Sequence, residues 1–377
     1  MTIANRRILV TGACGFIGKS VVLRLNELAG ITVSTFVRGE NDTDLIQLVS
    51  QADAVIHLAG ENRPDDAAAF SAVNAGLTST LCEAIAKEIR ATGRKIPLIL
   101  TSSTQADRDN LYGKSKLAAE KFVDALAEET GNPCFIFRLP GVFGKWCKPN
   151  YNSVVATFCY NIARGLPIHI NDATALIKLV YVDDVITAFF EALNSPQSGA
   201  VRSHVKPEYE ITLGELASQI QAFSQCRDSL ISERVGTGFV RALYATYVSY
   251  LPEEKFSYPV AKHADPRGVF VEMLKTHDSG QFSYFTAYPG ITRGGHYHHT
   301  KTEKFLVIKG KALFRFRHLI TNELFELTTC GENPEVVDTI PGWTHDITNI
   351  GDEEMIVMLW ANENFDREKP DTIAKKV

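Results

Sequence analysis

A tyrosine and a lysine stand four residues apart in the string YGKSK, as Tyr112 and Lys116. The segment that follows, LAAEKFVDALAEE, predicts a helix, and residues four apart share one helix face. A phenol donates a proton to a carbonyl oxygen near neutral pH only if an adjacent cation lowers its pKa. Lys116 would supply that cation, and a hydroxyl from the preceding TSST run would orient the substrate oxygen. The pattern predicts a carbonyl reductase; alone, it also occurs on solvated helix surfaces.

The string TGACGFIG, residues 11–18, follows an apolar strand and leads into the helical pattern KSVVLRLNEL. Its three glycines allow a tight turn, close approach of the backbone to a pyrophosphate, and close helix packing. The helix N-terminus offers free N–H donors to the same anion. We therefore expect a dinucleotide site that includes Gly12, Cys14, Gly15, Phe16, Ile17 and Gly18. The alternative is a glycine-rich turn without a ligand.

The next strand, TVSTFVRGE, brings Arg38 to the position where a site that prefers NAD typically carries an acidic residue for the ribose 2′-hydroxyl. A positive side chain there favours a 2′-phosphate. We therefore expect NADP(H) as the cofactor. The alternative is a solvated surface arginine.

A second group of polar residues lies near the other end of the chain, in GITRGGHYHHTKTEKFLVIKG. His296 and His298 are two apart, so on a strand they point to the same side and can converge on one ion. Glu303 would return from the next strand, and His345 in PGWTH offers a fourth ligand. Three imidazoles and a carboxylate suit Zn²⁺, although Fe²⁺, Mn²⁺, Co²⁺ or Ni²⁺ could occupy such a site. The alternative is a metal-free barrel whose histidines bind or deprotonate a substrate.

The predicted helices and strands that must position these two groups of residues follow different patterns along the chain. From the start to about residue 190, short apolar runs alternate with helix-period segments, which predicts an α/β Rossmann-type fold with a doubly wound parallel sheet. Beyond residues 251–259, closely spaced strands without intervening helices predict an all-β barrel or jelly roll. We expect a reductase domain over residues 1–250 and a barrel domain with the metal site over residues 251–377.

Composition narrows the classes of function. The 377 residues have a net charge of -5 and a pI near 6.1, which gives no global basic surface for nucleic acid. No apolar stretch is long enough for a signal peptide core or a membrane span, so we expect a cytoplasmic protein without a membrane partner. Seven scattered cysteines, never spaced CxxC, fit neither a disulfide framework nor a cysteine zinc site.

Taken together, TGACGFIG, DAVIHLAG, VNAG and YGKSK resemble the extended short-chain dehydrogenase/reductase family over roughly residues 6–250. The resemblance implies that Asp53 faces the adenine, that Leu58, Ala59 and Gly60 lie by the cofactor, and that Asn74 is the family's structural asparagine. It also implies Ser103 as the catalytic serine, with Ser102 as the alternative.

RLPGVFG and YVDDV are similar to family segments that bind nucleotide sugars. The family often has asparagine where this chain has Gly141. We therefore expect a substrate contact from Asn150 or Asn152.

The metal-site string has cupin spacing and closes on a glycine, which identifies the second domain as similar to the cupins. The segment between Pro341 and His345 is one residue shorter than the usual cupin form. DPRGVFVE and TRGGHYH resemble the segments in which cupin sugar epimerases hold substrate, here with Arg267, and place their base, which aligns with His296. His296 is therefore expected both as ligand and as catalytic base, two roles that compete. Tyr284, Tyr288 and Tyr297 are possible proton partners.

An extended reductase followed by a cupin resembles the bifunctional enzymes of capsular-polysaccharide synthesis. That resemblance implies a UDP-linked 4-keto-6-deoxy-N-acetylhexosamine as substrate, epimerised at C3 by the cupin and then reduced at C4 with NADPH, on the path to UDP-N-acetyl-L-fucosamine. The order has a chemical reason, because the C3 hydrogen is acidic only while C4 remains a ketone. We expect a homodimer.

Two other classes compete with this interpretation. In one, the cupin is a structural or dimerising module beside a simple NADP-dependent reductase. In the other, the protein is a regulator that senses NADP(H) with a degenerate active site. The intact set of Ser103, Tyr112 and Lys116 argues against the regulator.

Overall fold

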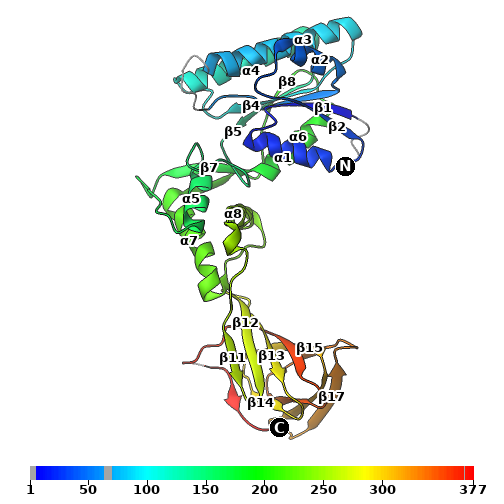
Figure 1. Cartoon of the computed structure of the whole chain (residues 1–377), viewed down its shortest axis with the longest axis vertical. Helices are drawn as coiled ribbons and strands as arrows, with labels where there is room; N and C mark the ends of the chain where they lie inside the picture. The colour runs from blue at the N-terminus through cyan, green and yellow to red at the C-terminus, as the bar shows by residue number, and fades with distance from the viewer. Residues whose placement is uncertain (1–5, 63–69, 369) are drawn as a thin grey trace. The chain divides into compact units, whose positions relative to one another are not determined.

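The computed structural model describes residues 6–62, 70–368 and 370–377, and the chain forms two compact units (Figure 1). The first unit contains Met1–Ile220 and Ala242–Leu251, and the second contains Gln221–Arg241 and Pro252–Val377. The chain therefore crosses between the units three times. Residues 221–241 group with the second unit, where β10 (Ile231–Ser232) pairs with β12 (Gly268–Thr276).

A six-stranded sheet forms the centre of the first unit, and all of its strand pairs are parallel. Its order is β2 (Ile31–Phe36), β1 (Arg6–Thr11), β3 (Ala54–His57), β4 (Leu98–Ser103), β5 (Cys134–Leu139) and β8 (Ala200–Ser203). The chain reverses its direction of travel across the sheet between β1 and β3. In open sheets of this kind, ligands bind outside the carboxyl ends of the strands at such a switch point.

Helices cover both faces of this sheet. The helical elements of this part of the chain are α1 (Phe16–Asn26), α2 (Asp42–Gln51), η1 (Phe70–Gly76), α3 (Leu77–Thr92), α4 (Leu111–Thr130), α5 (Val154–Ala163), α6 (Val182–Leu193), α7 (Leu213–Ser229) and α8 (Gly238–Val248). A small sheet accompanies them, formed by β6 (Gly141–Phe143), β7 (Leu176–Tyr181) and β9 (Tyr209–Thr212).

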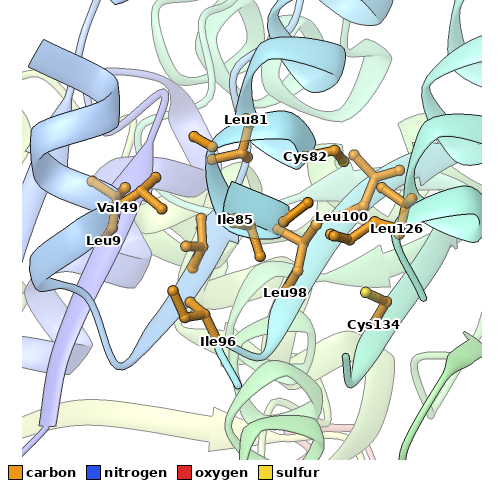
Figure 2. Packing of buried hydrophobic residues seen from close by; sticks show 14 of the residues in the cluster. Leu9, Val49, Leu81, Cys82, Ile85, Ile96, Leu98, Leu100, Leu126 and Cys134 are labelled. Carbon is orange, nitrogen blue, oxygen red and sulfur yellow. The ribbon is translucent and has the colours of Figure 1, made fainter. Parts of the chain in front are cut away.

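The strands are apolar on both sides, as expected for a parallel sheet covered on both faces. Leu9 and Leu98 pack in one cluster with Leu81 and Ile85 of α3 (Figure 2), while their neighbours pack in a second cluster with α1 and α6. Successive strand residues point to opposite faces. The alternation fixes which strand residues face which helix layer, and the predicted Rossmann-type fold is confirmed.

The second unit is built from two sheets with an apolar core, and their strand pairs are antiparallel except for the parallel pair of β10 and β12. One follows the order β10, β12, β13, β20, β15 and β18, with β11 on β12; the other follows β17, β16, β19, β14 and β21. The bounds not yet given are η2 (Glu253–Lys255), β11 (Lys262–Asp265), β13 (Gln281–Ala287), β14 (Thr292–Tyr297), β15 (Glu303–Lys309), β16 (Lys311–His318), β17 (Leu324–Cys330), β18 (Val336–Asp338), β19 (Trp343–Asn349), β20 (Met355–Ala361) and β21 (Ile373–Ala374).

Side chains from both sheets, including Phe285, Phe305 and Phe314, meet in this core, which is the arrangement of a jelly roll. The predicted cupin-like fold is confirmed. All seven cysteines are free thiols. Within the described ranges, no helix has both the length and the apolar character needed to cross a bilayer.

Candidate active site and metal centre

The glycine-rich turn between β1 and α1 has the geometry of a dinucleotide loop. Gly12 has a φ of +69°, and a Cβ there would lie 2.6 Å from the amide nitrogen of Ala59. A Cβ on Gly18 would overlap the carbonyl oxygen of Gly12. Helix α1 begins directly after Gly15, which has no side chain to cap it. Its first-turn N–H groups are therefore available to an anion, and the backbone at Ala59 lies beside the same loop.

A buried hydrogen-bond chain that the sequence did not reveal holds this region together. Thr78 donates to the carbonyl of Asn74 (2.7 Å) and so accepts from Nε2 of His57 (2.9 Å). Nδ1 of His57 then accepts from the Thr11 hydroxyl (2.7 Å), whose oxygen lies 3.2 Å from the N–H groups of Leu58 and Ala59. Burial, followed by the charge of Lys116, lowers the pKa of His57 to about 3. A neutral imidazole thus joins the end of β1 to α3.

Asn74 connects the end of β3 to the helix that carries the tyrosine. Its side chain accepts from the N–H of Glu61 (2.8 Å) and donates to the Glu61 carbonyl (3.1 Å) and to Ser115 Oγ (3.0 Å). A Cβ on Gly60 would lie 3.2 Å from the Lys116 ammonium. The structure therefore brings Gly60, Asn74 and Lys116 together.

Asp53 and Arg38 are placed differently. Asp53 precedes β3 and accepts from the backbone N–H of Arg7 (2.7 Å) at the start of β1. The glycine loop leaves the other end of β1, so the structure does not bring Asp53 to that loop, in contrast to the expectation that it faces the adenine. Arg38 follows β2, its side chain is 86 % exposed, and it forms an ion pair with Glu61. Glu61 has no marked sequence signal beyond its position after the β3 strand end.

The catalytic residues expected from the sequence meet at the start of α4. Asn110 caps this helix by accepting from Gly113 N (2.7 Å), and a Cβ on Gly113 would lie 2.6 Å from the carbonyl of Arg108. A side-chain hydrogen bond joins Tyr112 to Ser103 at the end of β4. The Lys116 ammonium lies 6.0 Å from the centre of the Tyr112 ring.

The electrostatics of this trio differ from the expectation. Burial raises the pKa of Tyr112, and the hydrogen bond with Ser103 opposes that effect. The ammonium of Lys116 donates instead to the carbonyl of Thr101 (3.1 Å). Burial lowers the pKa of Lys116 to about 8, against the charge of Glu120. Desolvation therefore outweighs the Ser103 hydrogen bond at the phenol, and both Tyr112 and Lys116 carry their protons at pH 7.

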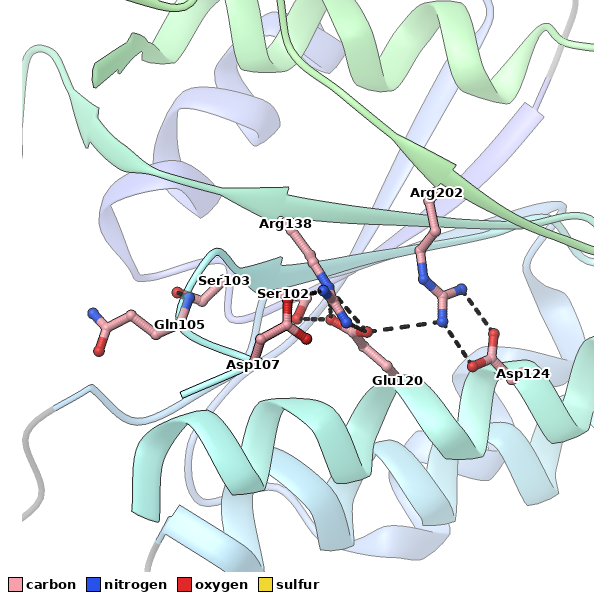
Figure 3. A network of polar contacts seen from close by, with 8 residues as sticks. All are labelled: Ser102, Ser103, Gln105, Asp107, Glu120, Asp124, Arg138 and Arg202. Carbon is pink, nitrogen blue, oxygen red and sulfur yellow. Dashed lines mark hydrogen bonds and ion pairs between the residues drawn. The ribbon is translucent and has the colours of Figure 1, made fainter. Parts of the chain in front are cut away.

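Ser102, the alternative serine, points to the opposite face of β4 and belongs to another network (Figure 3). Its hydroxyl donates to Glu120, a fully buried carboxylate on α4. Arg138 on β5 donates to the same carboxylate through Nε (2.9 Å) and Nη2 (2.8 Å). Arg202 on β8 lies 3.8 Å from it and pairs with Asp124 at 2.8 Å. The structure thus brings Ser103, and not Ser102, to Tyr112.

The residues expected to contact substrate lie in exposed segments. Asn150 and Asn152 are exposed in the loop before α5, and Asn150 has a φ of +54°. Arg267, between β11 and β12, forms an ion pair with Asp265 at 2.6 Å. None of these three has a recorded contact with the catalytic trio or with the histidine cluster among the residues the structure describes.

In the second unit, His296, His298, Glu303 and His345 converge. One ligand atom from each lies within 4.8 Å of all the others. His296 on β14 pairs in register with His345 on β19, next to a register shift at Gly294. The short segment before His345 therefore does not keep it from the cluster, since strand pairing sets its place.

The hydrogen bonds of this cluster leave room for a cation. Nδ1 of His298 donates to the carbonyl of Asp371, and Nε2 of the same ring faces Glu303 Oε2, 3.1 Å away. Among the described residues, neither buried ring nitrogen of His345 has a hydrogen-bond partner, and its Nε2 lies 3.5 Å from Glu303 Oε2. Burial, and then the nearness of His345, lower the pKa of His296 to about 4. Three imidazoles and a carboxylate, left partly unsatisfied, fit a divalent ion such as Zn²⁺.

Comparisons with known proteins cover both units. Residues 8–206 match the NAD dependent epimerase/dehydratase family, and residues 263–373 match the polysaccharide biosynthesis C-terminal domain. A Pseudomonas aeruginosa protein described as UDP-2-acetamido-2,6-beta-L-arabino-hexul-4-ose reductase is 56% identical over 98% of this chain and 99% of its own length.

Two solved structures complete the comparison. The capsular polysaccharide assembling protein CapF from Staphylococcus aureus is 41% identical, with a TM-score of 0.89 over 98% of this chain and 100% of that chain. The Bordetella bronchiseptica enzyme WbmF, in complex with NAD+, is 20% identical, with a TM-score of 0.53 over 59% of this chain and 80% of that chain. The second likeness shows the fold alone.

Proposed function

We propose, on the premise that this chain belongs to the NAD dependent epimerase/dehydratase family, that it is a bifunctional nucleotide-sugar enzyme. Its substrate is a UDP-linked 2-acetamido-2,6-dideoxy-4-ketohexose. The cupin-like unit epimerises the sugar at C3, and the first unit then reduces C4 with NADPH. The observation that carries the proposal is the meeting of Ser103, Tyr112 and Lys116 beside the glycine loop, in a chain 56% identical throughout to a protein described as a UDP-hexulose reductase.

In the reduction, the protein's residues bind and orient the ketone and supply a proton. NADPH, when bound, supplies the hydride that forms the C4–H bond. Tyr112 gives its phenolic proton to the C4 oxygen, so the ketone becomes an alcohol and the phenol a phenolate. Ser103, bonded to Tyr112, holds the same oxygen. Lys116, still a cation at pH 7, stabilises the phenolate, and the buried Thr101 carbonyl fixes its ammonium.

In the epimerisation, a base removes the C3 proton, the electron pair moves onto the C4 oxygen as an enolate, and a proton returns to the other face of C3. His296 is the most exposed member of the cluster, since the other three are buried, which favours it as the group that faces substrate. A divalent ion, when bound, would add positive charge beside the developing enolate. His298, Glu303 and His345 would then hold it, with His296 as fourth ligand or as base.

The test is incubation of the full chain with the UDP-4-keto sugar in D₂O, first without and then with NADPH, followed by NMR of the sugar. We expect deuterium at C3 before reduction, and a C3-inverted alcohol afterwards. Reduction without exchange or inversion would leave a simple reductase whose cupin is a structural or dimerising module. If neither deuterium exchange nor reduction occurs, the proposal is refuted.

Several finer points belong to the same proposal. Arg38 favours NADPH over NADH, although its ion pair with Glu61 must open for a 2′-phosphate to bind. Asn150 or Asn152 and Arg267 contact the substrate, Zn²⁺ is the ion, and the chain is a cytoplasmic homodimer. Metal analysis of the purified protein tests the identity of the ion, and size determination in solution tests the homodimer.

A further inference from the structure

The segment of residues 370–375, here called the strap, returns to the histidine cluster from far along the chain. The carboxylate of Asp371 accepts the backbone N–H groups of His299 (2.9 Å), Thr300 (2.7 Å) and Lys301 (2.8 Å). It also accepts the hydroxyl of Thr300 (3.1 Å). One side chain therefore closes the turn between His298 and Glu303.

The strap also contacts the strands that carry the other two histidines. β21 pairs with the end of β14, with Ala374 opposite His296, and Lys375 N donates to the carbonyl of Gly295 (2.9 Å). The hydroxyl of Thr344, the residue before His345, reaches both the carbonyl of Lys375 and that of His296 (3.2 Å). Thr344 is fully buried. Each of the three histidine segments is thus tied to the strap.

The contact with His298 has a chemical consequence. Its partner is the backbone carbonyl of Asp371, and a carbonyl can only accept, so the proton of the ring resides on Nδ1. Nε2 is then the nitrogen with a free lone pair, and it is the one that faces Glu303. Imidazole ligands are commonly oriented by such a partner on the other ring nitrogen, and its loss typically costs about 10–100-fold in metal affinity.

We infer that Asp371 and the strap are the positioning device of the metal centre: the strap fixes the tautomer and direction of His298 and closes the turn to Glu303. The inference rests on the proposed metal site. Asp371 is a positioning residue, because it acts through its backbone carbonyl and through the turn it holds. Its substitution should therefore change metal affinity and imidazole tautomer while the strands of the barrel remain paired.

The experiment compares Asp371→Ala and Asp371→Asn with the wild-type full chain, using Zn²⁺ alone in competition with a chromophoric chelator. Asp366→Ala is the matched control, because among the described residues that exposed aspartate in the same stretch bonds only the nearby N–H of Glu368. We expect Kd for Zn²⁺ to rise about 10–100-fold in Asp371→Ala, less in Asp371→Asn, and not in the control. In the metal-free protein, ¹⁵N shifts of His298 should show the Nδ1–H tautomer in the wild type and a mixture in Asp371→Ala.

The outcomes separate the two proposals. A wild-type chain that does not bind Zn²⁺ refutes the metal site, and the inference falls with it. If the wild-type chain binds Zn²⁺, and folded Asp371 variants bind it with equal affinity and show an unchanged His298 tautomer, only the inference about the strap is overturned. If Asp371→Ala does not fold, Asp371→Asn decides, because its amide oxygen keeps part of the turn.

Discussion

Each unit buries one glutamate beside its site, and the two are satisfied in different ways. Glu120 accepts from Ser102 and from two nitrogens of Arg138, which are donors at any ordinary pH. Glu303 faces Lys301 at 3.1 Å, but its other neighbours are His298 and His345. A neutral imidazole nitrogen without a proton cannot donate to a carboxylate.

The difference shows how a structural charge can be distinguished from a ligand. Both carboxylates are buried, at 0 % and 5 % exposure, so burial does not separate them. The hydrogen-bond donors around them do separate the two. The donors around Glu120 satisfy that carboxylate without an added ion, whereas Glu303 would be stabilised further by a bound cation. The first unit is thus expected to be self-sufficient in its polar network, and the second to depend on metal.

The largest expected effect is the loss of reduction in Tyr112→Phe, which separates the reaction of the first unit from that of the second. Tyr112→Phe removes the proton donor, so NADPH oxidation should fall by about 10²–10⁴-fold, while deuterium exchange at C3 continues. Stopped-flow absorbance and NMR on one preparation measure the two. If both activities fell together, the assignment of one reaction to each unit would be wrong.

The next effect tests the network of Glu120. Glu120→Leu removes the buried partner of the half-buried Arg138 and leaves it the exposed Asp107 at 2.7 Å, and we expect a loss of about 3 kcal/mol in unfolding free energy. Urea denaturation measures it. The double variant Glu120→Leu, Arg138→Met should recover most of the loss, because no uncompensated charge remains. A single variant as stable as the wild type would contradict a structural role for this ion pair.

Metal should stabilise only the second unit. Zn²⁺ at 100 times its Kd adds about 2.7 kcal/mol to the state that binds it, so hydrogen exchange should slow in β14 and β19 and not in β4 and α4. Glu303→Gln should lose most of this response. Equal protection of both units would mean that the ion binds elsewhere.

A smaller effect concerns the buried His57. His57 has both nitrogens bonded, and its folded pKa of about 3 lies below its unfolded value. The unfolded chain therefore binds the proton first as pH falls, and stability is lost from pH 6.5 downward, by about 1.4 kcal/mol at pH 5.5. His57→Gln should flatten this dependence in urea titrations of the first unit. An unchanged slope would mean that other groups cause the acid sensitivity.

The smallest effect is at the exposed Arg38. Exposed charge pairs contribute about 0.2–1 kcal/mol, so Arg38→Asp should shift the ratio of kcat/KM from NADPH towards NADH by about fivefold. Arg24→Asp, at an exposed position of α1, is the control. An unchanged ratio removes Arg38 from the cofactor site.

Sequence patterns predicted the sites whose residues are close together in the sequence. Tyr112 and Lys116 share one helix, and Gly12, Gly15 and Gly18 share one turn, so their spacing alone brings them together. The alternation of β4 separates Ser102 from Ser103 by face, which the family pattern indicated and the structure shows. Asp53 lies beside the start of β1, whereas the glycine loop follows its end, so the motif alone does not bring this residue to the loop.

Long-range partners could not be found in this way. Glu120 and Arg138 come from a helix and a strand that meet only in the fold, and Asp371 reaches His298 across 73 residues. Spacing alone does not fix the place of His345, because that place depends on the register with β14 and the shift between Gly294 and His296. Pairing between distant segments sets these positions.

The threefold crossing of the chain limits how the two activities can be exchanged between proteins. Ala242–Leu251 belongs to the first unit, yet segments of the second unit flank it on both sides in sequence. A recombination junction at residue 250 would deliver the barrel without β10, the strand that pairs with Lys275 and Thr276. Transfer of the intact second unit requires two further junctions, one at residues 220–221 within α7 and one at residues 241–242 within α8. The two units are thus expected to be inherited together and to be exchanged rarely by recombination between proteins.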